Sequence, residues 1–296
     1  MKLILKTIFL LLFVLFSQNI CLGTDIPSDS TTYISYHNIT QAQNFADGNG
    51  VKVAVLDWMF DLNPEAAKKY IDPVSLVPGQ HIGVYKAWHG EWMAKIIHRI
   101  APKAAIMPIR ARPKSKKNDN KGDVRPYQKY LVKGIRYAAD HGADFITNSM
   151  GPVKQTPELT EAVRYAAEKG AVFIDVHPEY VKVKNGKIVL CHSSKLNPLI
   201  MHPGIVSVAD HPRRSDSRRD FYTYPYDIDP VYKDGWGYSN GPPITAGIAA
   251  LMKSVDPKLK INEIKKILIE TADLRNGFKV IDAQAAVLEV RSRRNK

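Results

Sequence analysis

The sequence predicts an α/β fold in which a mostly parallel sheet is covered by helices on both faces. Three observations predict it: segments with the pattern of buried strands alternate with amphipathic helical segments, the chain has 296 residues, and 45% of them are hydrophobic. This length and composition suit one large domain with a substantial core and exclude global disorder. In such sheets, functional sites form at the carboxyl ends of the strands.

The elements follow from the local sequence in chain order. The first strand is the β-branched run 51–56, which Gly48-Asn49-Gly50 opens. The first helix begins near His89 and carries apolar side chains at helical spacing. Further strands are expected at 104–109, 144–148, 171–176 and 205–209. Further helices, two of them ended by glycine and the last begun by proline, are expected at 127–141, 156–169 and 242–255.

Residues 1–23 have the layout of a secretory signal peptide. Lys2 and Lys6 precede an apolar run over 7–16, and Gly23 is a small residue near the expected cleavage point. The run is too short for a membrane span, which needs about 20 residues. We therefore expect a secreted or periplasmic protein with no transmembrane span in the mature chain.

The two cysteines bear on how the mature protein is stabilised. Cys21 would suggest a lipoprotein, but Asn19 and Ile20 occupy positions where small residues are expected before a lipidated cysteine. Cleavage near Gly23 removes Cys21 and leaves Cys191, so we expect no internal disulfide. The stability of the exported protein must then come from its core.

The rest of the chain divides into three segments. Residues 24–45 are polar and are expected to form an N-terminal arm, residues 46–290 form the main domain, and residues 291–296 form a basic tail. The arm is too short to be a separate folding domain. Two stretches of the main domain, 110–125 and 212–232, are expected to be insertions or surface loops.

The positive charge of the chain constrains its partners. The formal net charge of +13 suits contact with anionic surfaces, such as an envelope component or acidic proteins. No zinc-finger spacing, RRM signature or basic zipper is present, so no nucleic-acid partner is predicted. Stretch 110–125 either recognises such an anion or is a solvated loop, which is the commoner outcome. Its basic residues are Arg110, Arg112, Lys114, Lys116, Lys117, Lys121 and Arg125.

Ser239 stands in a context that suits a nucleophile. It lies in Gly237-Tyr238-Ser239-Asn240-Gly241 before an apolar helix, whose first amide groups would polarise the hydroxyl. A simple helix N-cap is the ordinary alternative. The segment also matches the G-x-S-x-G elbow of α/β-hydrolases, where the histidine follows the serine. No histidine follows His211, which disfavours an esterase of that kind.

Five segments carry a resemblance, collinear over about residues 46 to 275. They are the strand 50–57 that ends in Asp57, His89-Gly90 at the head of a helix, the strand 144–151, the strand 202–208, and the serine turn with its helix at 237–247. Together they resemble the subtilases, the subtilisin-like serine peptidases (peptidase S8/S53), of which this chain would be a divergent member. Their order of Asp, His and Ser is the subtilisin order.

The resemblance implies a subtilisin-like three-layer sandwich and assigns roles to single residues. Asp57, His89 and Ser239 would form the catalytic triad. The backbone of Ser149, Met150 and Gly151 would align a peptide substrate as an added strand. No metal ligands or cofactor site are evident, and structural calcium is left open.

Departures from the family pattern concentrate at the site. Trp58-Met59 follow Asp57 where the family has Thr-Gly. The oxyanion asparagine of the family would follow strand 171–176, where this chain reads His177-Pro178-Glu179. His177 is then the candidate oxyanion donor, and loss of such a donor typically costs about 10²–10³ in kcat.

Two functions follow from this balance of resemblance and departure. The first is an exported serine endopeptidase that hydrolyses a polypeptide substrate through the Asp-His-Ser triad. The alternative is a catalytically weak or inactive subtilase-fold binding protein.

Overall fold

The computed structural model covers one domain from residue 32 onward. Within the residues it describes, no helix is long and apolar enough to cross a membrane. The expected signal peptide lies outside the described residues. These residues are 32–60, 62, 68–83, 89–113, 125–150, 156–176, 179–184, 187–192, 200–201, 203–205, 220–223, 238–275 and 278–295.

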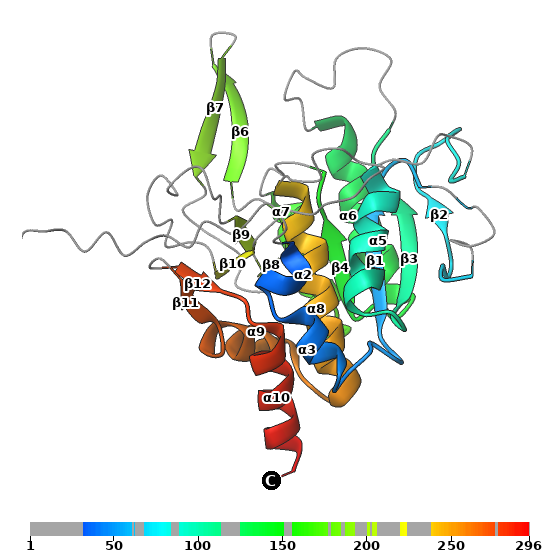
Figure 1. Ribbon diagram of the computed structural model, residues 1–296. Helices are drawn as coiled ribbons and strands as arrows, with labels where there is room; N and C mark the ends of the chain where they lie inside the picture. The colour runs from blue at the N-terminus through cyan, green and yellow to red at the C-terminus, as the bar shows by residue number, and fades with distance from the viewer. Residues whose placement is uncertain are drawn as a thin grey trace, which may run out of the picture. The chain divides into compact units, whose positions relative to one another are not determined.

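A six-stranded parallel sheet organises the domain and confirms the predicted fold class (Figure 1). Its strand order is β2-β3-β1-β4-β5-β8. β1 lies between β3 and β4, which places Asp57 at the carboxyl edge of the sheet. The strands are β1 (Lys52–Asp57), β2 (Val74–Ser75), β3 (Ala105–Arg110), β4 (Phe145–Asn148), β5 (Val172–Asp175) and β8 (Ile200–Met201).

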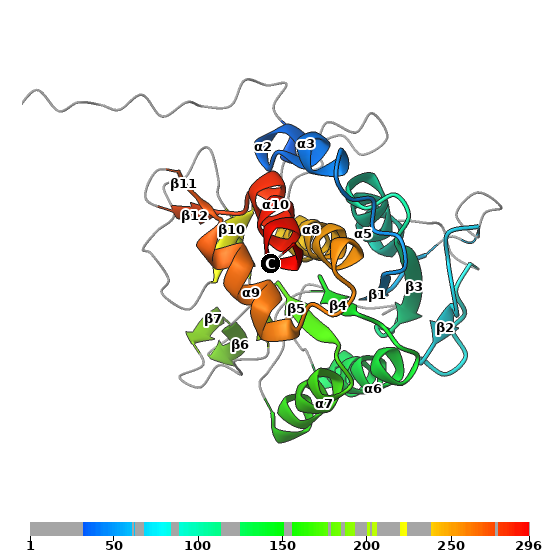
Figure 2. The ribbon, with the colours of Figure 1, turned by 90° about the horizontal axis from the view of Figure 1, so that it is seen from below.

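Helices cover both faces of the sheet (Figure 2). One face carries α6 (Arg125–Asp140) and α7 (Pro157–Glu168). The other face carries α5 (His89–Ile100), α8 (Gly241–Val255), α9 (Ile261–Glu270) and α10 (Ala283–Arg294). Successive side chains of β1 point to opposite faces, so Val53 and Val55 enter one core while Ala54 and Leu56 enter the other.

The contact between α5 and α8 is close because α8 has a glycine where the helices meet. A Cβ atom built on Gly247 would lie 2.8 Å from the Cβ atom of Ile100. The two helices begin at the candidate catalytic residues, α5 at His89 and α8 just after the turn that contains Ser239. Their close packing therefore sets the spacing between the two candidate catalytic segments.

Residues 32–45, expected to belong to a polar arm, instead form two helices that pack into the domain. These are α2 (Tyr33–Tyr36) and α3 (Ile39–Gln43), and Tyr33, Ile39 and Ala42 are fully buried. The Nδ1 atom of His37 lies 2.8 Å from the carbonyl oxygen of Ile281, just before α10. The polar residues of this segment are interspersed with apolar ones, and these three contribute to the core.

The C-terminal end also differs from expectation, since residues 291–294 of the predicted basic tail are the last turn of α10.

The predicted strand 205–209 corresponds to β9 (Pro203–Ile205), and residues 206–209 lie outside the described residues. β9 belongs to a second sheet of order β11-β12-β10-β9. β6 (Glu179–Lys184) and β7 (Lys187–His192) form a separate hairpin. The other strands are β10 (Phe221–Thr223), β11 (Asp273–Arg275) and β12 (Phe278–Val280).

The two predicted surface stretches are partly structured. Within 212–232, β10 is fully buried. Within 110–125, Arg110 ends β3 and is 1% exposed. Its Nη2 atom donates a hydrogen bond to Oε1 of Gln80 at 2.5 Å. A solvated-loop interpretation is therefore wrong for Arg110. Residues 114–124 lie outside the described residues.

Candidate active site

Asp57 and His89 are paired at the carboxyl edge of the sheet. Asp57 ends β1 and is fully buried, and both of its carboxylate oxygens face His89 Nδ1, at 2.9 Å (Oδ1) and 2.8 Å (Oδ2). The backbone N–H of Trp58 also donates to Asp57 Oδ1 at 2.7 Å. Because a carboxylate only accepts hydrogen bonds, Nδ1 of His89 carries a proton and Nε2 of the neutral ring keeps its lone pair. The pair is therefore arranged to act as a base.

The electrostatics of His89 support this role. Burial lowers the pKa of the imidazole, but the negative charge of Asp57 and the hydrogen bond to it outweigh burial and raise the pKa above 6.5. The positive charge of Arg112 partly opposes that increase in pKa. The His89 side chain keeps 20% of its surface exposed, which leaves it accessible from the solvent side.

Ser239 lies in a short 3-10 turn, η2 (Tyr238–Asn240), that leads directly into α8. It exchanges two hydrogen bonds with Ser149, the residue after β4. The Ser239 hydroxyl donates to the carbonyl oxygen of Ser149 at 3.2 Å, and the Ser149 hydroxyl donates to the carbonyl oxygen of Ser239 at 2.8 Å. The structure thus pairs Asp57 with His89. It pairs Ser239 with Ser149, and the hydroxyl of Ser239 points toward the Ser149 carbonyl group.

A hydrogen bond that the sequence did not reveal joins the histidine helix to the serine turn. Trp92 lies three residues after His89 on α5, and its Nε1–H donates to Oδ1 of Asn240 at 3.0 Å. Both side chains are buried, at 8% and 3% exposure. The i,i+3 spacing from His89 places Trp92 on the same side of the helix, which is the signal that could have pointed to it.

Arg112 is a second residue beside the site whose position was not foreseen. Its guanidinium lies 4.9 Å from the ring centre of Trp58 and 5.7 Å from that of Tyr127. Its Nη1 atom donates to the carbonyl oxygen of Met150 at 3.3 Å. Arg112 is therefore held by aromatic rings and by the segment expected to align the substrate, and it does not stand in a solvated loop.

The oxyanion side of the site is described only up to Val176. Asn148 and Asp175 are fully buried at the ends of β4 and β5, where Asn148 Nδ2 donates to Asp175 Oδ1 at 2.7 Å. His177 and Gly151, predicted as oxyanion donor and substrate-aligning residue, lie outside the described residues. Among the residues that the structure describes, no group of three or more His, Cys, Asp or Glu side chains could hold a metal ion.

Comparisons with known proteins agree with the fold of the domain. No protein-family model matches the chain. The sequence is 25% identical over 265 residues to thermitase of Thermoactinomyces vulgaris, a match that covers 80% of this chain and 86% of that protein. The MycP3 protease from the type VII (ESX-3) secretion system has a similar structure, with a TM-score of 0.68 and 20% identity over 90% of this chain and 89% of the other. Fervidolysin from Fervidobacterium pennivorans, a keratinolytic enzyme related to subtilisin, gives a TM-score of 0.58 and 20% identity over 84% of this chain and 44% of its own.

Proposed function

We propose that this chain, which has the subtilisin-like fold and is a distant homologue of thermitase, is a serine endopeptidase that acts through Asp57, His89 and Ser239. The observation that carries the proposal is the buried carboxylate of Asp57 with both oxygens on His89 Nδ1. A buried carboxylate is costly unless it is paired, and here its partner is a histidine at the head of the helix that contacts the serine turn.

The chemistry assigned to these residues is acyl transfer. The Ser239 hydroxyl turns from Ser149 toward His89, and its oxygen attacks the scissile carbonyl carbon while Nε2 of His89 takes the proton. Asp57 holds the imidazole and stabilises the imidazolium that forms. His89 then returns the proton to the leaving amine, and water hydrolyses the acyl-enzyme by the same route. The Ser239 backbone N–H is one oxyanion donor and His177 is the proposed second.

The cellular setting is part of the proposal. The layout of residues 1–23 supports export, with a polypeptide as the substrate outside the cytoplasm. The net charge of +13 supports contact with an anionic envelope component. Appearance of the protein in the periplasm or medium, shortened near Gly23, is the expected result of fractionation, and retention of the full chain in the cytoplasm would contradict it.

A second candidate function has its own supporting observation. The hydroxyl of Ser239 donates to Ser149, and the family pattern is broken both at Trp58-Met59 after Asp57 and at the expected oxyanion segment 177–179. These features favour a subtilase-fold protein that binds polypeptides and cleaves them weakly or not at all.

A serine-directed fluorophosphonate probe distinguishes the two functions. Covalent labelling of the folded protein at Ser239, lost in Ser239→Ala and kept in the matched control Ser35→Ala at an exposed position of α2, supports the peptidase. Hydrolysis of a fluorogenic protein substrate should follow the same pattern. Absence of labelling in a protein that circular dichroism shows to be folded would support the binding protein instead.

A further inference from the structure

Arg112 reaches across the edge of the sheet at which Asp57 and His89 are paired. It follows the end of β3, and β3, β1 and β4 are neighbours in the sheet. Its guanidinium lies over the ring of Trp58, which follows the end of β1. It also donates to the carbonyl oxygen of Met150, which lies just beyond the end of β4. The side chain therefore joins the catalytic edge to the segment expected to align a substrate.

These contacts hold the guanidinium without cancelling its charge. An aromatic ring attracts a cation through its quadrupole, and a carbonyl group accepts a hydrogen bond, but neither carries a net charge. The charge of Arg112 also acts on His89, since burial and Arg112 lower the pKa of the imidazole while Asp57 raises it. Arg112 therefore adds a positive charge to the field around the candidate catalytic pair.

Two strands of the sheet end in an acidic residue, and both of these residues are buried. Asp57 ends β1, and its carboxylate faces His89 Nδ1. Asp175 ends β5, and its carboxylate accepts a hydrogen bond from Asn148. Arg112 instead keeps part of its surface exposed. A ligand that approaches this edge from solvent therefore reaches Arg112 before it reaches either carboxylate.

The expected path of a polypeptide brings its side chains close to Arg112. A peptide aligned as an added strand on the backbone of 149–151 runs past Met150, whose carbonyl group Arg112 binds. Side chains of an extended strand alternate between two sides, so every second residue at most can face Arg112. A guanidinium has several N–H donors, and it can bind a carboxylate while it keeps the bond to Met150.

We propose that Arg112 selects polypeptide substrates with an acidic side chain near the scissile bond, at one position or at two positions separated by one residue. A carboxylate forms an ion pair with the guanidinium, whereas the amide of glutamine or asparagine makes only a weaker hydrogen bond. This inference rests on the proposed function, because it places a polypeptide in the candidate active site. It adds a class of substrate, which the triad alone does not define.

Binding to the Ser239→Ala chain tests the proposal in the absence of cleavage. An eight-residue, fluorescein-labelled peptide of alanine and leucine carries one central glutamate, and its counterpart carries glutamine there. Each peptide is titrated with the protein and followed by fluorescence anisotropy. We expect the glutamate peptide to bind about fivefold more tightly, as for a partly exposed ion pair, and the difference to shrink as salt increases.

Substitution of Arg112 separates a role in specificity from a structural one. Arg112→Gln should remove the difference between the two peptides and leave the affinity for the glutamine peptide nearly unchanged. A purely structural role would instead weaken the binding of both peptides equally. Arg112→Met also removes the charge, and its long, unbranched side chain can still pack on Trp58 and Tyr127. It tests the same point if Arg112→Gln impairs folding.

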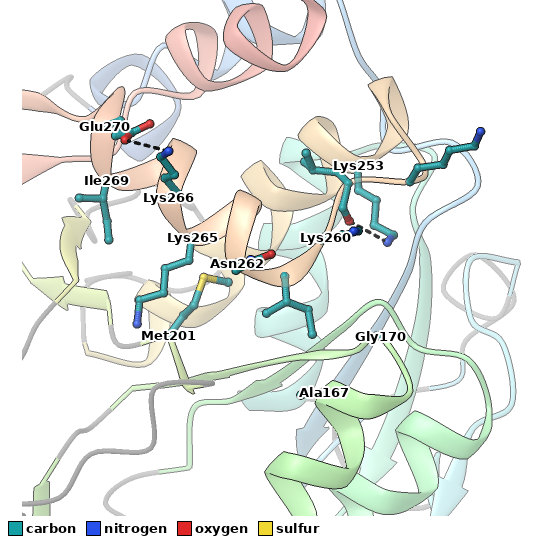
Figure 3. Close-up of a pocket in the computed structure, with 13 residues that line it drawn as sticks. Ala167, Gly170, Met201, Lys253, Lys260, Asn262, Lys265, Lys266, Ile269 and Glu270 are labelled. Carbon is teal, nitrogen blue, oxygen red and sulfur yellow. Dashed lines mark hydrogen bonds and ion pairs between the residues drawn. The ribbon is translucent and has the colours of Figure 1, made fainter. Parts of the chain in front are cut away.

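Two control variants remove positive charge elsewhere. Arg136 on α6 also lies over an aromatic ring, 4.9 Å from the ring centre of Tyr165, so Arg136→Gln makes the same change in a similar contact. A groove of about 940 Å³ beside α9 is lined by lysines that include Lys258 and Lys260, and it offers an acidic peptide another place to bind (Figure 3). Arg136→Gln, and Lys258→Gln with Lys260→Gln, should both keep the fivefold preference.

Cleavage by the unsubstituted chain gives the position of the acidic residue. A mixture of peptides from denatured proteins is digested, and the cleaved bonds are identified by mass spectrometry. We expect acidic residues to be enriched at one position relative to the cleaved bond, or at two positions separated by one residue. Arg112→Gln should lose this enrichment.

The outcomes separate this inference from the peptidase proposal. Equal affinity of the Ser239→Ala chain for the two peptides, or a preference that Arg112→Gln retains, would overturn the role of Arg112. Cleavage with acidic residues equally frequent at every position would overturn it as well, and would leave the peptidase proposal intact. An Arg112-dependent preference in binding without any cleavage by the unsubstituted chain would support the role of Arg112 and contradict the peptidase.

Discussion

Replacing His98 with glutamine should reduce the loss of stability of this protein in acid. His98 lies on α5, and its Nε2 atom is buried with no hydrogen-bond partner among the described residues. Burial and the positive charge of Lys69 lower its pKa from 6.5 to about 4, although a hydrogen bond to the backbone of Ala104 opposes the shift. Glutamine has a similar polar character and cannot take up a proton in this range.

The sign and size of the effect follow from linkage. As the pH falls through 6.5, His98 becomes protonated in the unfolded chain. In the folded chain His98 becomes protonated only near pH 4. The folded state therefore loses stability over this window, by about 2 kcal/mol between pH 7 and pH 5 and by about 3 kcal/mol in total. Between pH 7 and pH 5, the free energy of unfolding of His98→Gln should therefore fall by about 2 kcal/mol less than that of the parent.

Urea unfolding at pH 7 and pH 5, followed by circular dichroism in the Ser239→Ala background, measures the difference. Other titrating groups contribute equally to both proteins and cancel. His141→Gln, at an exposed position after α6, is the matched control and should behave as the parent does. An identical loss of unfolding free energy in His98→Gln and in the parent would refute the assignment of His98 as a partly buried, neutral histidine.

Two further predictions concern the candidate site. The pKa of His89 is raised above 6.5, and the neutral ring is the base. The rate of fluorophosphonate labelling should therefore fall as the pH decreases, with the midpoint of the fall above pH 6.5. A midpoint below pH 6.5 would contradict the pairing with Asp57. Trp92→Phe removes the donor to Asn240 and should cost about 1 kcal/mol of stability. If the bond positions the serine turn, the same variant should lower the labelling rate about tenfold while Ser35→Ala does not, and an unchanged rate would limit Trp92 to a structural role.

Much of the central fold could be predicted from the sequence because its elements carry strong local patterns. β1, β3, β4 and β5 are continuous apolar runs that are buried on both faces, and α5 to α8 have the expected apolar spacing. The elements that were missed are short or polar. β2 and β8 have two residues each, and α10 is half polar, so their structure depends on partners distant in the chain.

The contacts of the candidate site and its surroundings could likewise be predicted only in part. The pairing of Asp57 with His89 was expected from the order of the motifs. The burial of Arg110 was not, because its partner Gln80 lies 30 residues earlier and outside any regular pattern. The i,i+3 spacing from His89 could have placed Trp92 beside the site. It could not have identified Asn240 as the partner of Trp92, because the two residues are 148 positions apart in the chain.

The first helices of the domain also have a consequence for the order in which it folds. His37 and Asn38 bond to positions 281 and 282, a separation of 244 residues, and α3 packs against α10. Contacts between such distant positions form late, because a long loop must close before they contribute. A chain synthesised from its N-terminus therefore carries Tyr33, Ile39 and Ala42 without their full cover until α10 has emerged. Packing of the 12 residues of α10 against the rest of the domain therefore completes the core.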